Sequence, residues 1–299
     1  MNSPHTLFEH ALADAARLAE ESLDALLPKV TGPEAPVLEA MRYAALGGGK
    51  RLRAFLVIQS GSLFGVDRRS LGRVAAAVEC VHAYSLVHDD LPAMDDDDLR
   101  RGKPTVHKAF DEATAILAGD ALLTHAFALI GSPEAHGDPF VRCELVTRLA
   151  QASGHAGMVG GQMMDMAFEG KAPSLAEITR MQRMKTAALL NFSCEAGAIL
   201  GKASQPMRNA LQAYGQELGL AFQIADDLLD AEGDAGETGK AVGKDAERGK
   251  TTVVSVLGAE RARMQAKALA EQAVRHLDLF DRKADFLRAA AGFVIERRA

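Results

Sequence analysis

Hydrophobic residues recur every three or four positions along most of the chain, which is the spacing of one buried helical face. Strict alternation of hydrophobic and polar residues, the pattern of a half-buried strand, is scarce. The pattern predicts an all-α protein of about ten helices, packed as a single domain over residues 1–299. The predicted helices cover residues 7–27, 37–46, 52–64, 71–90, 112–130, 139–168, 174–201, 206–231, 251–279 and 284–298.

Capping residues and glycines mark where these helices begin, bend or end. Ser174 followed by Glu177 forms a capping box that opens the helix over 174–201. Four glycines within 139–168 indicate a kink or the close approach of another helix, because glycine destabilises a helix interior by about 1 kcal/mol. Residues 233–249 contain five glycines and no helical pattern, so we expect a lid or binding loop there, or else a plain surface connection.

The composition is that of a soluble globular protein, with 48% hydrophobic and 25% charged residues and no tryptophan. Its three cysteines lie far apart and form neither a CxxC site nor a disulfide framework, which indicates a reducing compartment. No uncharged apolar stretch approaches the ~18 residues of a membrane span, and the N-terminus lacks the pattern of a signal peptide. We therefore expect a cytoplasmic protein without membrane insertion.

The charge is uneven along the chain. Lysine and arginine number 34 against 40 acidic residues, a net charge of −6 that disfavours nucleic-acid binding. Six aspartates fall within ten positions, namely Asp89, Asp90, Asp95, Asp96, Asp97 and Asp98. Such a cluster repels itself, so it is either a solvated acidic turn or a cation site.

The cation site is favoured because an apolar segment, residues 74–87, leads directly into these aspartates. Pro92 lacks the N–H that would bond to the carbonyl of His88, so the helix must bulge there. The bulge can bring Asp95 towards Asp89. Several carboxylates together suit Mg²⁺, which shares its coordination shell with water and substrate phosphates.

A second acidic motif follows the apolar residues 218–225. Asp226 and Asp230 are four positions apart, so their carboxylates share one helix face beside Asp227. A DDxxD motif alone is weak evidence, since many helix ends are acidic. None of the three has a basic partner four positions on, and two such motifs in one chain strongly favour metal binding.

Basic residues adjoin turns and both acidic motifs. They include Lys50, Arg51, Arg53, Arg100, Arg101, Lys185, Lys240, Lys244 and Lys250. Arginine and lysine can bind the diphosphate oxygens that metal leaves uncovered. The sequence therefore predicts a hydrocarbon diphosphate as substrate, and it contains no catalytic triad motif, Walker loop or GxGxxG fingerprint.

In this order the motifs resemble those of the trans-isoprenyl diphosphate synthases. The similar segments are Gly48–Arg53, Asp89–Gly102, Gly161–Asp165, Lys185–Thr186, Gln223–Asp230 and Gly249–Thr252. The similarity runs from about Val37 to the C-terminus, and the two extra residues between Asp89 and Asp95 are typical of bacterial members that make a C15 product. It implies a helix bundle around a central apolar cavity, and commonly a homodimer.

The resemblance implies that isopentenyl diphosphate adds to dimethylallyl diphosphate and then to geranyl diphosphate, through an ionised allylic carbocation. It also implies about three Mg²⁺ ions per site, held by Asp89, Asp90, Asp95, Asp226, Asp227 and Asp230. The allylic substrate would contact Arg100, Lys185, Thr186, Gln223, Lys240 and Lys250. Isopentenyl diphosphate would contact Lys50, Arg53, His82 and Arg101. The residues expected to carry catalysis are Asp89, Asp95, Arg100, Lys185 and Asp226.

Product length is expected to depend on Tyr84 and Ser85, which precede Asp89 on one helix by about 6–7.5 Å of rise. A synthase of geranyl or geranylgeranyl diphosphate would differ only in pocket depth. A non-catalytic partner subunit should have lost one motif, and this chain keeps both. Val253-Val254-Ser255 stands where relatives often have Tyr-Pro, which leaves closure of the lid open.

Overall fold

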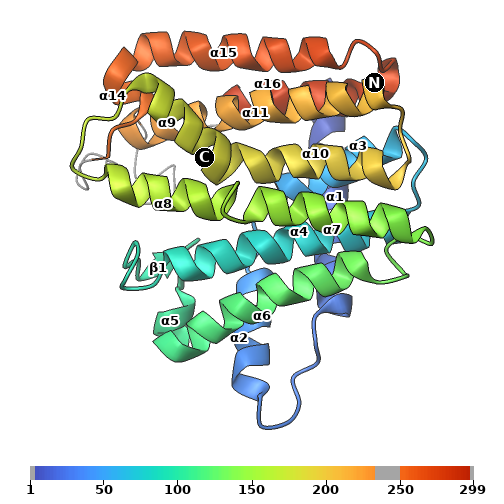
Figure 1. The fold of residues 1–299 in the computed structure, drawn as a ribbon, viewed down its shortest axis with the longest axis vertical. Coiled ribbons are helices and arrows are strands. Elements are labelled where there is room, and N and C mark those ends of the chain that lie inside the picture. The colour runs from blue at the N-terminus through green and yellow to red at the C-terminus, as the bar shows by residue number, and fades with distance from the viewer. Residues whose placement is uncertain (1–3, 233–249, 297–299) are drawn as a thin grey trace. The chain divides into compact units, whose positions relative to one another are not determined.

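The computed structural model describes residues 4–232 and 250–296, which are almost entirely helical (Figure 1). The prediction of an all-α protein is confirmed. The helices are α1 Pro4–Leu26, α2 Ala35–Ala45, α3 Leu52–Ser62, α4 Arg68–Asp89, α5 Val106–Ala109, α6 Glu112–Gly131, α7 Pro139–Ser153, α8 Met158–Phe168, α9 Leu175–Gln182, α10 Ala188–Leu200, α11 Gln205–Glu232, α14 Val253–Leu257, α15 Ala259–His276 and α16 Asp285–Glu296. A hairpin of two short antiparallel strands, β1 Leu99–Arg100 and β2 Lys103–Pro104, follows α4.

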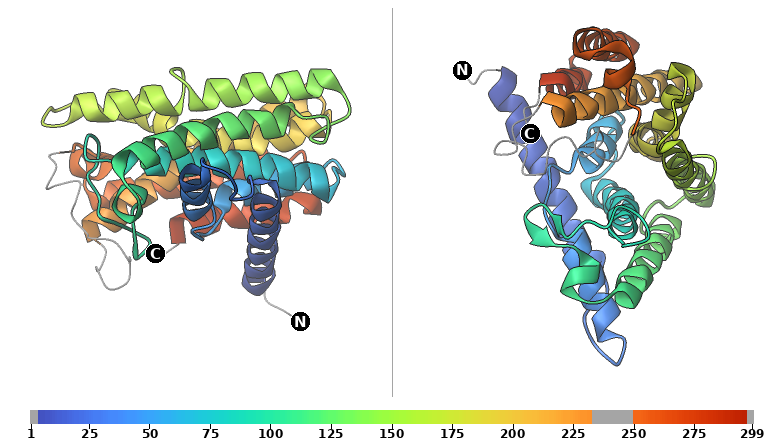
Figure 2. Two further views of the ribbon diagram at one scale, coloured as in Figure 1. Left: turned by 90° about the horizontal axis from the view of Figure 1, so that it is seen from below. Right: turned by 90° about the vertical axis from the view of Figure 1, so that its left-hand side faces the viewer.

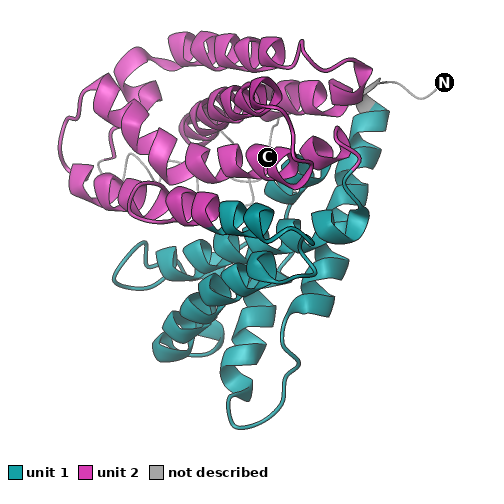
Figure 3. Cartoon of the chain, turned by 45° about the vertical axis from the view of Figure 1, so that its right-hand side comes forward, with its two compact units in different colours: residues 1–58, 66–146 teal, residues 59–65, 147–299 magenta. Residues whose placement is uncertain are grey.

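The chain divides into two compact units (Figure 3). Unit 1 comprises residues 1–58 and 66–146, and unit 2 comprises residues 59–65 and 147–299. The first aspartate motif belongs to unit 1 and the second belongs to unit 2. The single domain over 1–299 stays a prediction.

Helix α4 is the centre of unit 1. Its N-terminus is capped by Asp67, whose carboxylate accepts the N–H groups of Arg69 and Ser70 at 3.0 Å. Helix α4 packs along α6 and against α1 (Figure 2). The rings of Phe8 and Phe55 meet edge to face at 5.5 Å. The long apolar pattern of α4 is thereby buried, and its polar C-terminal end carries the first motif.

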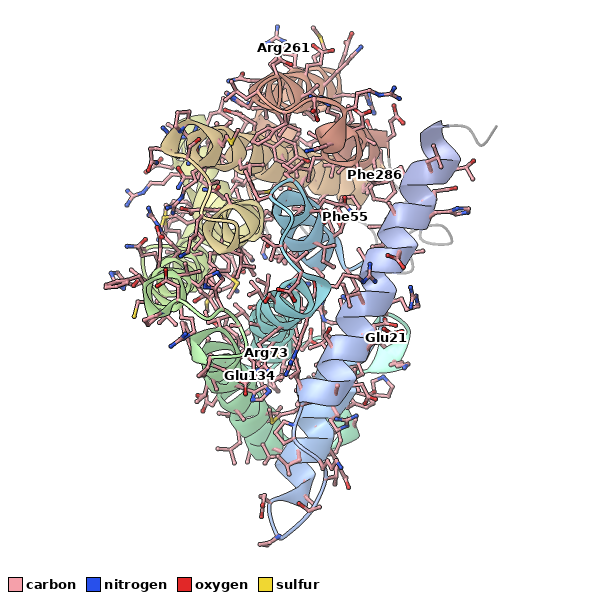
Figure 4. The ribbon with its side chains drawn as sticks, turned by 90° about the vertical axis from the view of Figure 1, so that its right-hand side faces the viewer. Glu21, Phe55, Arg73, Glu134, Arg261 and Phe286 are labelled. Carbon is pink, nitrogen blue, oxygen red and sulfur yellow. The ribbon has the colours of Figure 1, made fainter. Side chains whose placement is uncertain are left out.

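Helix α6 is, among the described residues, the one helix long and apolar enough to cross a membrane by length and composition. No such segment was expected from the sequence, because Asp120 interrupts this apolar stretch. Within unit 1, α6 packs against α4, α2 and α5. One side of unit 1 also carries Arg73 beside Glu134, with charged atoms 4.0 Å apart (Figure 4).

Unit 2 is built around α11, which packs against α15 and α10 (Figure 1). A buried cluster joins α11 to α9, α14 and α15, with Ile178, Ile224, Val253, Val254, Ala262 and Ala266 as its members. The hydroxyl of Tyr214 donates to the carbonyl of Leu287 at 2.7 Å and ties α11 to α16. These contacts fix the helix that carries the second motif.

Several predicted helices are broken where local backbone chemistry favours a break. The helix expected over 139–168 stops at Ser153 and restarts at Met158, across Gly154 and Gly157. The helix expected over 251–279 breaks at Gly258, where φ is +80°. The helix over 174–201 opens with the predicted capping box but contains a π-helical turn at Arg183–Ala187. Lys240 and Lys244, with the expected lid at 233–249, lie outside the described residues.

Candidate functional site

The first aspartate motif folds back on itself after α4. The N–H of Asp95 donates to the carbonyl of Asp89 at 2.8 Å, and the N–H of Met94 donates to the carbonyl of Leu91 at 2.9 Å. Both Asp89 and Asp95 are partly exposed. The return of Asp95 towards Asp89, predicted from Pro92, is therefore confirmed.

The second aspartate of this motif points elsewhere. Asp90 is 2% exposed, and its carboxylate accepts hydrogen bonds from Arg100 Nε and Nη2 at 2.6–2.9 Å. Burial raises the pKa of the Asp90 carboxyl, and the bonds from Arg100 offset this effect only in part. To bind a metal ion, the Asp90 carboxylate would have to release Arg100. The pair itself anchors the β1–β2 hairpin, which carries Arg100, to the end of α4.

The basic residues of unit 1 meet beside the triple glycine. Arg101 donates from Nη1 to the carbonyl of Gly48. Gly49 has a φ of +117°, a backbone conformation that favours glycine, and a Cβ there would lie 2.8 Å from the Arg101 guanidinium, which would have to shift. Desolvation holds the pKa of His82 well below its usual range, and the nearby charges of Arg53 and Arg101 lower it further. The structure thus brings together Arg53, His82 and Arg101, three of the residues predicted to bind isopentenyl diphosphate.

The two residues expected to set product length occupy different surroundings on α4. Tyr84 is 6% exposed, and its ring meets His88 edge to face at 5.6 Å. Burial raises the pKa of Tyr84 to about 12. Ser85 is partly exposed, and its hydroxyl donates to the carbonyl of His82 at 2.9 Å. Ser85 lies one helical turn before Asp89, whereas Tyr84 belongs to the packed interior.

The second motif divides in the same way. Asp226 is exposed and Asp230 is partly exposed, four positions apart on α11. Asp227 is 5% exposed, and its carboxylate accepts from Gln182 Nε2 at 3.0 Å and from Gln223 Nε2 at 2.9 Å. The side chains of Asp226 and Asp230 both reach solvent. Asp227 instead fastens α11 to the end of α9.

Lys185 lies in the π-helical turn, which inserts one extra residue into the helical ladder. Its Nζ donates to Asp165 Oδ2 at 2.6 Å, and Lys250 Nζ donates to the same oxygen at 3.2 Å. Burial would raise the pKa of Asp165, but the two lysines outweigh it and lower that pKa. A Cβ on Gly161 would lie 2.1 Å from the backbone nitrogen of Lys185. The close approach expected from the glycines is therefore present.

Thr186 and Gln223, both predicted to contact the allylic substrate, bond to each other. Thr186 Oγ1 donates to Gln223 Oε1 at 2.7 Å, and Gln223 in turn donates to Asp227.

No role was predicted from the sequence for Asp165 or Gln182. The four-residue spacing from Gly161 to Asp165, which places both on one helix face, was the available signal for Asp165.

Within the described residues, no group of three or more His, Cys, Asp or Glu side chains is arranged to hold a metal ion by itself. Mg²⁺ is usually held by one or two carboxylates together with water and substrate phosphates. The pairs Asp89 with Asp95 and Asp226 with Asp230 provide carboxylates of this kind. The donor chemistry therefore fits Mg²⁺ bound jointly with a diphosphate.

Comparison with known proteins gives consistent matches over nearly the whole chain. A family model described as polyprenyl synthetase matches residues 34–286. The farnesyl diphosphate synthase of Escherichia coli (strain K12) is 44% identical over 297 residues, which cover 97% of this chain and 99% of that protein. The farnesyl diphosphate synthase of Geobacillus stearothermophilus is 43% identical over 289 residues, with 96% of each chain covered.

Solved structures of similar proteins match this chain as well. The crystal structure of an FPP/GFPP synthase from Zymomonas mobilis superimposes with a TM-score of 0.90 at 49% sequence identity, covering 97% of this chain and 99% of that one. These matches confirm the predicted resemblance. They span both compact units.

Proposed function

The chain belongs to the polyprenyl synthetase family, and we propose that it is a farnesyl diphosphate synthase. It condenses isopentenyl diphosphate with dimethylallyl diphosphate and then with geranyl diphosphate, giving the C15 product. The observation that carries this proposal is the pair of aspartate motifs, each accompanied by its own cations. The named relatives, similar over nearly their whole length, support it.

In unit 1, Lys50, Arg53, His82 and Arg101 bind the diphosphate of isopentenyl diphosphate. The lowered pKa of His82 keeps its imidazole neutral, so it serves as a hydrogen-bonding group rather than as a further cation. A neutral donor among arginines adds directionality without adding repulsion. The alkene of the bound substrate is the nucleophile of the condensation.

Arg100, Lys185 and Lys250, with Lys240, stabilise the negative charge that develops on the leaving diphosphate as the allylic C–O bond ionises. Asp165 holds Lys185 and Lys250 together before substrate arrives. Thr186 and Gln223 orient the same diphosphate. Because pyrophosphate can accept the final proton, no protein base is required.

We propose Mg²⁺ as the cofactor, about three ions per site, which supplies Lewis-acid stabilisation of the leaving diphosphate. Asp89, Asp95, Asp226 and Asp230 are the ligands whose exposure suits this role best. Asp90 and Asp227, which the sequence also assigned to the metal, would first have to exchange their bonds to Arg100 and to Gln182 and Gln223.

The direct test is incubation with isopentenyl and dimethylallyl diphosphates and Mg²⁺, followed by chromatographic sizing of the product. We expect a C15 product, lost on addition of EDTA and restored by excess Mg²⁺. A C20 product would favour a geranylgeranyl diphosphate synthase and a C10 product a geranyl diphosphate synthase. Failure to elongate any allylic diphosphate would favour a non-catalytic partner subunit.

We further propose that the enzyme is cytoplasmic and forms a homodimer. Helix α6 supports self-association. Only 39% of its most apolar stretch is buried, and the side chains of Ile116 and Leu117 are 45% and 57% exposed. The molar mass from analytical ultracentrifugation should be twice that of the 31.8 kDa chain.

The double substitution Ile116→Glu with Leu117→Glu should halve the measured mass, because buried carboxylates without partners oppose the interface. Met264→Glu, at a side chain 67% exposed on α15, is the matched control and should leave the mass unchanged. A monomeric wild-type protein would contradict the dimer.

A further inference from the structure

Unit 1 contains a buried ion pair between Arg51, in the basic loop before α3, and Glu79 on α4. Arg51 Nη1 lies 3.1 Å from Glu79 Oε2, and the two side chains are 4% and 3% exposed. The proposed function uses neither residue. Burying two charges costs free energy unless both are paired and hydrogen-bonded, so a buried pair next to a substrate loop calls for a role.

The pair fastens three helices at one point. Arg51 Nη2 donates to the carbonyl of Ala45, the last residue of α2, at 2.7 Å. Glu79 Oε1 accepts the N–H of Ala54, in the first turn of α3, at 3.1 Å. One guanidinium and one carboxylate therefore join the end of α2, the start of α3 and the middle of α4.

The backbone at Arg51 is held in an unusual conformation. Its φ is +49°, in the left-handed region that an arginine rarely adopts, and such conformations persist where surrounding contacts determine them. This φ sets the direction of the chain between Lys50 and Arg53. Lys50 is exposed and Arg53 partly exposed, whereas Arg51 between them is buried. The buried guanidinium of Arg51 therefore fixes the backbone from which the side chains of Lys50 and Arg53 project.

Glu79 also supplies negative charge among several cations. Burial lowers the pKa of Arg101, the charge of Arg51 lowers it further, and the charge of Glu79 opposes both effects. The carboxylate thus offsets repulsion between Arg51 and Arg101. Without it, two arginines would repel each other beside the triple glycine that Arg101 contacts.

We propose that Glu79, acting through Arg51, is a positioning residue for the site that binds isopentenyl diphosphate. It holds Lys50 and Arg53 in the orientation that meets the diphosphate, and it contacts no substrate itself. This inference rests on the proposed function, in which Lys50, Arg53 and Arg101 bind that substrate.

The test is Glu79→Gln, which keeps the size of the side chain. Arg51 and Ala54 donate to different oxygens of Glu79, and glutamine replaces one of these oxygens by an NH2 group that only donates, so both bonds cannot persist in place. We expect KM for isopentenyl diphosphate to rise about tenfold, while KM for geranyl diphosphate stays within about twofold and kcat falls less than KM rises.

Arg51→Lys is the second variant, because lysine keeps the charge but cannot reach Glu79 and Ala45 at once with a planar fork. It should produce the same selective rise in KM. In the double variant the two effects should add up to less than their sum, because both changes disrupt the contact between Arg51 and Glu79. If Glu79→Gln fails to fold, Arg51→Lys carries the test.

Glu195→Gln is the matched control for buried charge. Glu195 of unit 2 is also buried, and its Oε1 lies 3.2 Å from Arg208 Nη2 and 3.4 Å from Arg148 Nε. This variant should lose thermal stability like Glu79→Gln but leave both KM values unchanged. The same selective rise in KM in Glu195→Gln would show a purely structural effect and overturn the proposal.

Calorimetric binding of isopentenyl diphosphate to the full chain gives a readout that does not require turnover. Wild-type affinity in both Glu79→Gln and Arg51→Lys, or an equal rise in KM for both substrates, would overturn the positioning role. A wild-type chain that elongates no allylic diphosphate contradicts the proposed function instead, a result obtained before any variant is measured. In that case the positioning role falls with the function on which it rests.

Discussion

Asp89→Asn is expected to lower kcat by on the order of 100- to 1,000-fold with little change in protein stability. Loss of one group that stabilises charge in a transition state costs about that much. Asparagine has the same shape but no negative charge, so it weakens cation binding. The carbonyl of Asp89, which accepts from the N–H of Asp95, is unaffected by the side-chain change. Steady-state turnover at saturating substrates measures the effect.

Asp96→Asn is the matched control from the same acidic run. Asp96 is exposed and has a φ of +49°, a conformation that asparagine tolerates as well as aspartate does. Turnover should stay within about twofold of wild type, because Asp96 is exposed and is not one of the proposed metal ligands. Near-normal turnover in Asp89→Asn would remove Asp89 from the metal site. An equal loss in Asp96→Asn would show that the motif acts only through its total charge.

Ser85→Phe is expected to change the main product from C15 to C10. Ser85 lies one helical turn, about 6 Å of rise, before Asp89 and is partly exposed. A phenyl ring there should occupy the space that the third isoprene unit needs. A tenfold change in the C15 to C10 ratio requires only about 1.4 kcal/mol between the two elongation steps. Product sizing by chromatography, with dimethylallyl diphosphate as the starting allylic substrate, measures this ratio.

Ser70→Phe provides the matched substitution on the same helix. Ser70 is also partly exposed but lies in the first turn of α4, where its N–H bonds to Asp67. Its product should remain C15. If Ser85→Phe still makes C15 at the wild-type ratio, Ser85 does not line the product pocket. The buried contact of Tyr84 with His88 would then be the remaining candidate on this stretch of α4.

The features predicted correctly from the sequence are those that depend on neighbouring residues. The capping box of Ser174 and Glu177 and the return of Asp95 to Asp89 after Pro92 involve residues three to six positions apart. Backbone geometry at that range is set by local hydrogen bonds and by proline chemistry. The break at Gly258 was missed because helical periodicity continues across it, whereas Gly154 and Gly157 had already indicated a kink where α7 ends and α8 begins.

The roles of individual carboxylates could not be predicted at all from the motifs. Asp89 and Asp90 are adjacent in sequence, as are Asp226 and Asp227, yet one member of each pair is buried and hydrogen-bonded while the other is exposed to solvent or partly so. Neighbouring residues on a helix point about 100° apart, so the packing of the helix decides which one is buried.

The sequence by itself determined that the chain is all-helical, that it carries two aspartate motifs with adjacent cations, and that it resembles isoprenyl diphosphate synthases. Periodicity and residue chemistry suffice for these conclusions. Only the tertiary structure decided that Arg100 pairs with Asp90, that Lys185 and Lys250 share Asp165, and that Arg51 is buried against Glu79. These partners lie 10 to 85 positions apart, and the free energy of a buried charge depends on a partner that only folding brings into contact.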